Sequence, residues 1–523
     1  MLFLKNNTNL FQLILYSCSS IFFGIAAGIN ISLPISCLIT VCTLAVVFSL
    51  LQKCRSQLQE SFQVFFWAFG FVGGTTYWIV IAIYDPIRTP ASMAWMVGSF
   101  VFFIHACIYA LCYCSVRSTI GYMFSRFQKS YSPDTKFLPP AAISLPLSIG
   151  IAEVVRTCGF WAMPWGMIGY TQVSNPVLTG LYPVVGIYGV ATTTAALSVV
   201  LVYWIKLTQT YWSQSENIAW NSYFKINFTK FISFAAVLSV LFSTQFIQWT
   251  TASDTPIRAR VVHTHMPNIE KYDLKVQKEA QEKMVALSRL DDADLTLYPE
   301  LYMVQPGYAI DKKLRKAIVD GVVETKNAQI FGSPSYKIDV DGRTKGSYNA
   351  LIEIDTLGKT KQYAKEILLP FSEYMPDHPV LSWAMPYILK FPLSNFTSGI
   401  AANTDRFIIE NTNIAASLCN ESVYTFHVHS QVLDKHMLIN SASDSWVPNR
   451  MYERHSWQIL KARALEAQKP LLRSNNTGYS GFIDAWGKEH QMEYGIESDV
   501  VFNITPRYGN TPFTIMAAFF AKL

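Results

Sequence analysis

Long apolar runs separated by short polar segments fill the first half of the chain. A membrane helix needs about 20 apolar residues, because each residue adds about 1.5 Å across a hydrocarbon core about 30 Å thick. Seven runs meet this requirement and predict seven membrane helices, at about residues 9–27, 31–51, 62–84, 92–115, 137–157, 177–205 and 231–249. The first run could also be read as a signal peptide ending at Cys18, but Tyr16 fits a cleavage box poorly and further spans follow at once.

The pattern changes after about residue 255 to short apolar segments that alternate with amphipathic ones. We expect strands at Val261–Val262 and at 295–297, 328–333, 347–354, 361–368 and 414–418, and helices at 271–289, 308–319 and 451–468. Such alternation is typical of an α/β domain in which helices pack on sheets. The sequence therefore predicts a multi-pass α-helical membrane domain at 1–250 and an α/β soluble domain at 255–508.

A short apolar tail occupies residues 509–523. Its last stretch, Thr511 to Leu523, has too few residues to span a membrane. It could be a truncated last span that lies along the membrane interface, or a segment that packs on the soluble domain.

Composition narrows the function classes. Hydrophobic residues make up 51% of the chain and charged residues 15%, against about 25% charged in soluble proteins. The net charge of +6 is modest, and no basic stripe interleaves with aromatic residues, which argues against nucleic acid as a partner. Eight of the nine cysteines lie in the membrane half, so Cys419 has no partner for an internal disulfide or a paired zinc site in its own domain.

The distribution of basic residues predicts the orientation of the chain. If Lys5 lies inside, the outside loops hold only Arg88 and Arg156. The inside loops then hold Lys53, Arg55, Arg117, Arg126, Lys129, Lys136, Lys206, Lys225 and Lys230. By the positive-inside rule this asymmetry, with an odd number of spans, delivers the soluble domain to the outer side, which in a bacterium is the periplasm.

Two ionisable residues, Glu153 and Arg156, fall near the end of the fifth apolar run. Charges inside a membrane are costly and usually mark a working cavity. The alternative is a pair of anchors at the outer interface, and the sequence favours neither. The aromatic, turn-rich stretch that follows, Gly159 to Gly166, is typical of a loop at the level of the lipid headgroups.

Three residues of the soluble half could carry chemistry. Cys419 follows a short apolar strand, where a thiol can project into a cleft as a nucleophile, although a lone cysteine is also a common inert core residue. Glu300 follows Pro299 just beyond a strand and suits a general base, unless it is a surface carboxylate. Lys365, in an apolar run, could stabilise an oxyanion if it is buried, or could be a solvated strand lysine.

Together, Glu300, Lys365 and Cys419 have the order and the spacings, about 65 and 54 residues, of the nitrilase-superfamily triad. The flanking motifs resemble those of the apolipoprotein N-acyltransferases, the membrane branch of that superfamily. The matching segments are Phe69–Gly74 with Trp78, Pro164–Tyr170, Gly186–Val190, Tyr298–Glu300, Lys365–Pro376, Cys419–Glu421, Ala462–Glu466 and Pro470–Gly478. The resemblance covers about residues 60–500 and implies a nitrilase-like αββα sandwich for the soluble domain.

The resemblance implies a ping-pong N-acyltransferase that needs no metal or cofactor. Cys419 would take the sn-1 acyl chain of a phospholipid, typically phosphatidylethanolamine, as a thioester, with Glu300 as base and Lys365 stabilising the oxyanion. The α-amine of a diacylglyceryl-cysteine at a lipoprotein's N-terminus would then accept the chain, at the bacterial inner membrane. Glu373, Glu421 and Asn349 match auxiliary residues of the family, although each could instead be a structural hydrogen-bonding residue.

Several positions depart from the family pattern near the mouth of the expected site. Tyr298 replaces a usual tryptophan, Asn420 replaces a usual aromatic residue, and Ser443–Pro448 differs from the usual Asn-Asp-Ala-Trp-Phe-Gly. These changes put the acyl donor, the acceptor and the rate in doubt more than the fold. Two alternatives therefore stay open: a related membrane-bound amidase or acyltransferase with another acceptor, and a catalytically impaired paralogue that only binds lipoproteins.

Overall fold

The computed structural model describes residues 2–82, 91–131, 140–159, 162–214, 220–266, 270–304, 311–338, 344–370, 372–374, 395–401, 407–409 and 411–522. The chain forms two compact units, described separately below: Met1–Val80 with Met96–Ile247, and Ile81–Trp95 with Gln248–Leu523. Several predicted features lie outside the described residues: Arg88, Lys136, Phe160–Trp161 and, in the Lys365–Pro376 motif, Phe371 and Met375–Pro376.

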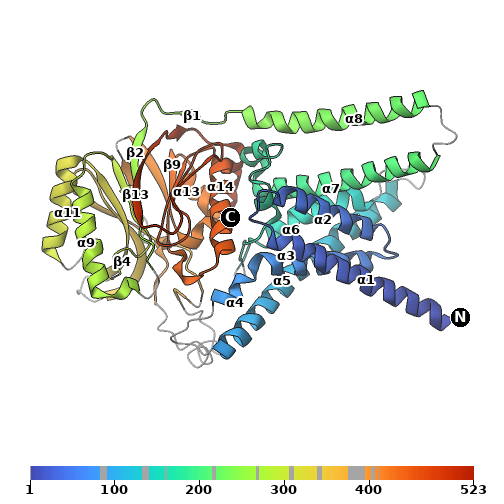
Figure 1. The fold of residues 1–523 in the computed structure, drawn as a ribbon, viewed down its shortest axis with the longest axis horizontal. Helices are drawn as coiled ribbons and strands as arrows, with labels where there is room; N and C mark the ends of the chain where they lie inside the picture. The colour runs from blue at the N-terminus through green and yellow to red at the C-terminus, as the bar shows by residue number, and fades with distance from the viewer. Residues whose placement is uncertain are drawn as a thin grey trace. The chain divides into compact units, whose positions relative to one another are not determined.

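The first unit is built from helices, labelled in Figure 1. They are α1 (Leu2–Ile29), α2 (Ser36–Leu51), α3 (Gln57–Thr76), α4 (Trp78–Ala82), α5 (Ala91–Tyr131), α6 (Pro140–Val155), α7 (Tyr182–Gln214) and α8 (Trp220–Ser243). The end of α4 and the start of α5 fall in the segment Ile81–Trp95, which belongs to the second unit. Within the described residues, three helical segments are long and apolar enough to cross a membrane: Ala94–Arg126, Thr179–Gln209 and Phe228–Phe246. Three shorter apolar helices cover Ile14–Ile29, Ser36–Leu51 and Ala141–Val155. Each predicted apolar run thus contains a helix in the structure. The number of helices that cross the membrane stays a prediction.

Helices α1 and α3 pack closely through two glycine pairs. Gly24 and Gly28 of α1 face Gly70 and Gly74 of α3, each pair at the four-residue spacing common in membrane helices. A Cβ atom on Gly24 would lie 2.2 Å from the Trp67 carbonyl oxygen, and one on Gly70 would lie 2.3 Å from that of Ile21. No side chain fits between backbones at that distance, so these glycines set the separation of the two helices.

Glu153 and Arg156, the charged pair near the end of α6, are both buried inside the first unit. Arg156 donates to the carbonyl oxygens of Trp165 (2.6 Å) and Gly166 (3.3 Å). Glu153 Oε1 accepts from the Tyr113 hydroxyl (2.6 Å) and the Ile168 backbone N–H (3.0 Å). The two side chains therefore hold the irregular backbone after α6 by supplying hydrogen bonds that lipid cannot supply.

The second unit contains two six-stranded sheets and a short two-stranded ladder. One sheet has the order β13 (Ser498–Ile504), β2 (Ile257–His263), β3 (Leu295–Leu297), β4 (Ala328–Ile338), β5 (Thr344–Ile354), β6 (Thr360–Ala364). The other has the order β12 (Glu489–Gln491), β11 (Gly481–Ile483), β10 (Leu471–Asn475), β9 (Met437–Ala442), β8 (Thr412–Leu418), β7 (Phe407–Ile409). The central strands are parallel in each sheet, β2–β3–β4 in one and β8–β9–β10 in the other.

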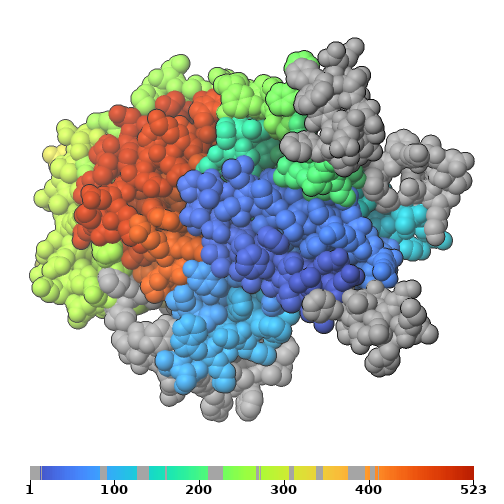
Figure 2. All heavy atoms as spheres, turned by 45° about the vertical axis from the view of Figure 1, so that its right-hand side comes forward, coloured from blue at the N-terminus to red at the C-terminus, as the bar shows by residue number. Residues whose placement is uncertain are grey.

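The sheets pack face to face with helices outside. Apolar residues of both sheets share one core, which includes Val261 and Leu297 from one and Ile414 and Ile439 from the other. Helices α9 (Leu274–Ser288) and α11 (Lys312–Thr325) cover the outer face of the first sheet, and α13 (Thr425–Val432) and α14 (Arg450–Ala467) that of the second (Figure 1). The two halves lie side by side in Figure 2, yellow-green and orange-red. This αββα sandwich confirms the predicted fold class.

Most elements predicted in the soluble half are confirmed, with one strand too long. The expected strand at 361–368 ends at Ala364, because the N–H groups of Glu366 and Ile367 bond to the Glu421 carboxylate instead of to β5. In the tail, Pro512–Phe520 forms helix α15, which buries Phe513 and Ala517.

Candidate active site

The three predicted reactive residues each lie just beyond the end of a strand. Glu300 follows β3 by three residues, Lys365 follows β6 directly and Cys419 follows β8 directly. The turn at Glu300 is tight, with Leu301 at φ 49°, and it passes so close to β4 that a Cβ on Gly332 would lie 2.3 Å from the Leu301 nitrogen. Since parallel strands of a sheet end at one edge, strand ends from both sheets can meet in one site.

Glu300 and Lys365 meet in a buried cluster completed by Asn349 and Glu373. The Lys365 ammonium nitrogen lies 2.8 Å from Glu373 Oε2 and 3.4 Å from Glu300 Oε1. The Asn349 amide donates to Oε1 of both carboxylates, at 2.7 Å each. Lys365 is 2% exposed and Glu300 5%, so neither is the solvated surface residue that the sequence also allowed.

The charge on Lys365 is maintained by its neighbours. Burial alone would lower its pKa, but the carboxylates of Glu300 and Glu373 and the nearby Cys419 raise the pKa of Lys365 well above its ordinary value. The lysine is therefore an ammonium at neutral pH. It is held at a fixed place where it can stabilise a developing negative charge.

Cys419 is held in a backbone conformation that few residues adopt. Its φ is 48°, in the left-handed region, where a residue with a Cβ is strained. Its carbonyl oxygen accepts hydrogen bonds from Ser422 Oγ (3.1 Å) and Asn440 Nδ2 (3.3 Å), which hold this turn at the start of a short 3₁₀ segment. Strain of this kind at a strand-to-helix turn is a common way of presenting a nucleophile.

Electrostatics keep the Cys419 thiol protonated at rest. Burial raises its pKa well above the ordinary value, the charge of Glu300 raises it further, and Lys365 partly opposes both. Glu300 and Lys365 are thus close enough to influence the sulfur. A neutral thiol beside a carboxylate and an ammonium suits acyl transfer, in which the carboxylate removes the thiol proton only as the sulfur attacks.

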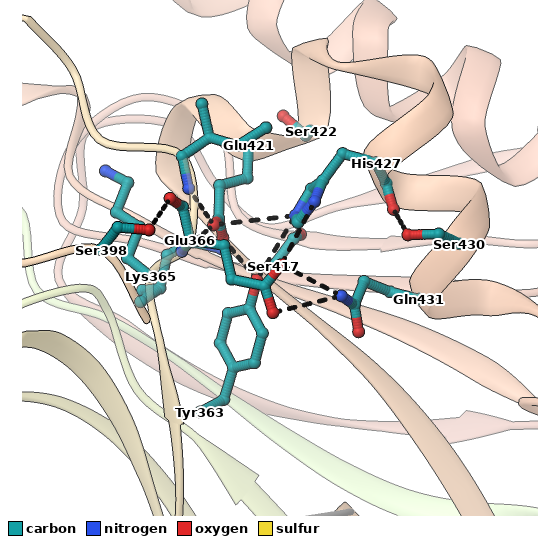
Figure 3. Close-up of polar contacts among 12 residues, drawn as sticks. Tyr363, Lys365, Glu366, Ser398, Ser417, Glu421, Ser422, His427, Ser430 and Gln431 are labelled. Carbon is teal, nitrogen blue, oxygen red and sulfur yellow. Dashed lines mark hydrogen bonds and ion pairs between the residues drawn. The ribbon is translucent and has the colours of Figure 1, made fainter. Parts of the chain in front are cut away.

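Glu421, fully buried, ties the backbone next to Cys419 to the backbone next to Lys365. One carboxylate oxygen accepts from the N–H groups of Glu366 (2.6 Å) and Ile367 (3.1 Å). The other accepts from the Leu418 N–H (2.7 Å) and from the Tyr363 hydroxyl (3.0 Å). Figure 3 shows this carboxylate in the centre of its partners. Glu421 therefore fixes the separation of the segments that carry the thiol and the ammonium.

His427 of α13 lies on the other side of Glu421. Its ring nitrogens lie 3.7 Å from Glu421 Oε1 and 3.6 Å from Glu366 Oε2 (Figure 3). Gln431, one helical turn further on, donates to Glu366 at 3.4 Å. Sequence reasoning missed His427, Glu366 and Tyr363. His427 and Tyr363 stand outside the matching motifs, and Glu366 lies inside Lys365–Pro376 but received no role there. Only the closeness of Tyr363 and Glu366 to Lys365 in the chain could have pointed to them.

The segment Ser443–Pro448, which departs from the family pattern, includes a buried ion pair. Arg473 donates to Asp444 Oδ2 at 2.6 Å, and Asn475 Nδ2 donates to the same oxygen at 2.7 Å. Burial raises the pKa of Asp444, while Arg473 and the Asn475 hydrogen bond oppose that rise. Although this segment differs from the family pattern, two residues of β10 hold its Asp444 carboxylate in place. The charge of Asp444 contributes to the raised pKa of Cys419.

Both halves of the chain match known family models. Residues 24–201 match the apolipoprotein N-acyltransferase N-terminal domain, and residues 258–493 match the carbon-nitrogen hydrolase domain. Among curated relatives, the apolipoprotein N-acyltransferase of Methylococcus capsulatus is 27% identical over 71% of this chain and 69% of its own length. Those of Nitrosomonas europaea and Wigglesworthia glossinidia brevipalpis are each 23% identical, over 86% and 90% of this chain and 83% and 91% of their own lengths.

Solved structures that are similar to this chain cover about half of it. A CN-hydrolase superfamily protein from Xanthomonas campestris, with an arsenic adduct in its active site, covers 48% of this chain and 90% of its own at 15% identity and a TM-score of 0.34. A carbon-nitrogen hydrolase from Helicobacter pylori covers 51% and 93%, at 13% identity and a TM-score of 0.36.

Proposed function

Because the chain belongs to the apolipoprotein N-acyltransferase family, we propose that it moves the sn-1 acyl chain of a phospholipid onto lipoproteins by way of a thioester on Cys419. The acceptor is the N-terminal amine of an S-diacylglyceryl-cysteine, and phosphatidylethanolamine is the donor. The distribution of basic loops supports a place in the bacterial inner membrane with the second unit on the periplasmic side.

One observation carries the proposal. A buried ammonium, two carboxylates and a bridging amide converge beside a cysteine in a strained backbone conformation. A core of purely structural residues has no need for an unpaired thiol next to such a charged cluster, whose burial costs free energy.

In the first half of the reaction, the Glu300 carboxylate accepts the thiol proton as the sulfur attacks the ester carbonyl carbon. The carbonyl oxygen becomes an oxyanion, which the Lys365 ammonium stabilises. When the tetrahedral intermediate collapses, the carbon–oxygen bond of the ester breaks. The glycerol oxygen takes the proton from Glu300, lysophospholipid leaves, and a thioester remains on Cys419.

In the second half, the neutral α-amine of the diacylglyceryl-cysteine attacks the thioester carbonyl carbon. Glu300 accepts a proton from the nitrogen, and Lys365 again stabilises the oxyanion. The carbon–sulfur bond breaks, the proton returns to sulfur, and the product is an amide. Two moderate barriers thus replace the single high barrier of direct aminolysis of an ester.

Three further residues position this machinery. Asn349 orients the Glu300 carboxylate through a 2.7 Å hydrogen bond, and Glu373 holds the Lys365 ammonium at 2.8 Å. Glu421 fixes the backbone on both sides of the site through its four hydrogen bonds. Because none of the three is the nucleophile, their conservative variants should slow the reaction without abolishing thioester formation.

The test supplies both substrates at once. The purified full chain in detergent receives phosphatidylethanolamine with a tagged sn-1 chain and a diacylglyceryl-cysteine peptide, and mass spectrometry follows the peptide. The proposal predicts one acyl chain on the peptide's α-amine, absent with Cys419→Ala and with a peptide whose amine is acetylated. Tagged free fatty acid with unmodified peptide would show a hydrolase instead. No transfer from any phospholipid tried would overturn the proposal.

A further inference from the structure

The ring of His427, on α13, lies between two carboxylates. Its Nδ1 is 3.6 Å from Glu366 Oε2, and its Nε2 is 3.7 Å from Glu421 Oε1 and 3.5 Å from the Tyr363 hydroxyl oxygen (Figure 3). This hydroxyl already donates to Glu421 at 3.0 Å, so its oxygen is left to accept from the ring. Both ring nitrogens therefore face acceptors. A neutral imidazole has one N–H and the imidazolium has two, so the surroundings of the ring suit the charged form.

The Glu421 carboxylate needs a positive charge nearby because it is fully buried. Its four hydrogen bonds all come from donors, three backbone N–H groups and one tyrosine hydroxyl, and a protonated carboxyl would bring a fifth donor among them. Burial raises the pKa of Glu421, and His427 opposes this rise more strongly than Lys365 does. The Lys365 ammonium is in contact with Glu300 and Glu373 instead.

The charged groups that α14 presents to α13 lie on the opposite face of that helix from His427. Arg463 donates to the Thr425 hydroxyl, and Glu466 contacts His429 at 2.9 Å. Thr425 and His429 are each two positions from His427, which in an α-helix places them on the other face. Helix α15 and strand β8, which also pack against α13, carry no charged residue. In the described part of the chain, the titratable groups that face the ring are thus the two carboxylates and the tyrosine.

Glu421 connects the charge on His427 to the reactive residues. One of its oxygens holds the backbone directly after Lys365, and the other holds the backbone directly before Cys419. A proton on Glu421 would break at least one of these contacts and change the separation of the thiol and the ammonium. A misplacement of about 1 Å at a reacting centre can cost about 10²-fold in rate.

We propose that His427 is a positioning residue of the acyl-transfer site, an imidazolium that bridges Glu366 and Glu421 and keeps Glu421 an ionised acceptor. The inference rests on the proposed function, since it concerns how fast Cys419 takes up the acyl chain. His427 acts through Glu421 and not on the thiol itself. It protects the reaction against acid, because without the imidazolium Glu421 takes up a proton more readily as the pH falls.

The test measures single-turnover acylation of the full chain in detergent, with phosphatidylethanolamine tagged on its sn-1 chain, from about pH 6 to about pH 9. In His427→Gln, burial raises the pKa of Glu421 with less opposition, so this carboxylate is protonated at low pH and ionised again at high pH. We expect the variant to be about tenfold slower than the parent at about pH 6 and within about twofold of it at about pH 9. A ratio that does not change with pH, or no loss of rate at about pH 6, would overturn the proposal.

Two further variants show whether the charge or the shape of the ring matters. His427→Lys keeps a cation and should recover at least about half of the parent's rate at about pH 6. His490→Gln is the matched control, because His490 stacks on Phe482 and lies on β12, four places from β8 in the sheet. It should change neither the rate nor its pH dependence. A His427→Lys variant as slow as His427→Gln would contradict the role of the charge.

A readout without substrate separates the failure of this inference from the failure of the proposed function. Thermal unfolding at about pH 6 compares the effect of His427→Gln in the parent and in Glu421→Gln. We expect the midpoint to fall by about 3 °C or more in the parent and by no more than about half as much beside Glu421→Gln, where the buried charge is gone. Equal losses would overturn the inference, whatever the acylation assay shows. Unequal losses in a protein that forms no thioester would support the ion bridge and count against the proposed function alone.

Discussion

Removing the Lys365 ammonium should destabilise the second unit and slow thioester formation together. In Lys365→Met the apolar side chain keeps the approximate length, but Glu300 and Glu373 lose the cation that lies 3.4 Å and 2.8 Å from them. Asn349 alone then bridges two buried carboxylates. Breaking a buried ion pair by removing one partner costs about 3–5 kcal/mol, which for a domain of this size lowers the unfolding midpoint by about 10 °C.

A second substitution separates the two effects. Adding Glu373→Gln to Lys365→Met removes one uncompensated charge and keeps the shape of the site, so we expect about half of the lost stability to return. The rate of thioester formation should stay about 10² to 10³ below that of the parent in both variants, because neither has the cation that stabilises the oxyanion. Lys316→Met, on an exposed lysine paired with Asp320, should change neither quantity measurably.

Thermal unfolding in detergent, followed by tryptophan fluorescence, and single-turnover acylation by a tagged phospholipid give the two quantities. If the double variant is no more stable than Lys365→Met, the ammonium is not what compensates the two carboxylates. If Lys365→Met keeps the parent's acylation rate, the assignment of oxyanion stabilisation to this lysine is wrong.

Three further predictions concern other parts of the chain. Glu421→Gln should slow thioester formation about tenfold or more. Each carboxylate oxygen of Glu421 accepts from two donors, so the amide nitrogen of the glutamine would face two donors in either orientation. An unchanged single-turnover rate would contradict the positioning role. Burial lowers the pKa of His263 to about 4, so its stabilising contribution is complete above about pH 6.5 and decreases by about 3 kcal/mol as the pH falls through 4. The difference in unfolding midpoint between the parent and His263→Gln should therefore shrink over that range, and a difference independent of pH would refute it. Gly28→Val should lower the yield of folded protein, because the new Cβ would lie 2.4 Å from the Phe71 carbonyl oxygen. The control Ile25→Val, which changes an exposed side chain of the same helix, should not lower the yield. Equal yields would refute the close packing of α1 and α3.

The positions of the reactive residues could be predicted because each stands at the end of an apolar strand. Strand ends, motifs and chain order were enough to pick out Glu300, Lys365 and Cys419. In the structure, the Lys365 ammonium nitrogen lies 3.4 Å from Glu300 Oε1. Their shared partners Asn349 and Glu373 were matched only through the family resemblance, because strand ends and chain order do not point to them. Asn349 lies in the middle of β5, and it reaches Glu300 only because β5 lies two places from β3 in the sheet. Strand order is a property of the whole fold, and no local pattern encodes it.

The two faces of α15 show a second limit of sequence reasoning. Residues 511–523 are almost uniformly apolar, so their periodicity gives no direction for the helix. The direction comes from Thr511 and Thr514, which bond to Glu466 and His429 about 45 and 85 residues earlier in the chain. In the same way, the sequence left open what Glu153 and Arg156 do, since their partners at 165–168 are backbone groups of an irregular loop.

The central claim is that Cys419 carries the acyl chain. The most direct test incubates the full chain in detergent with phosphatidylethanolamine tagged on its sn-1 chain and without acceptor, beside Cys419→Ala. The account predicts one tag on the peptide that contains Cys419, released by neutral hydroxylamine, and none on the variant. A tag that persists in Cys419→Ala, or no tag on the folded parent with any phospholipid, would contradict it.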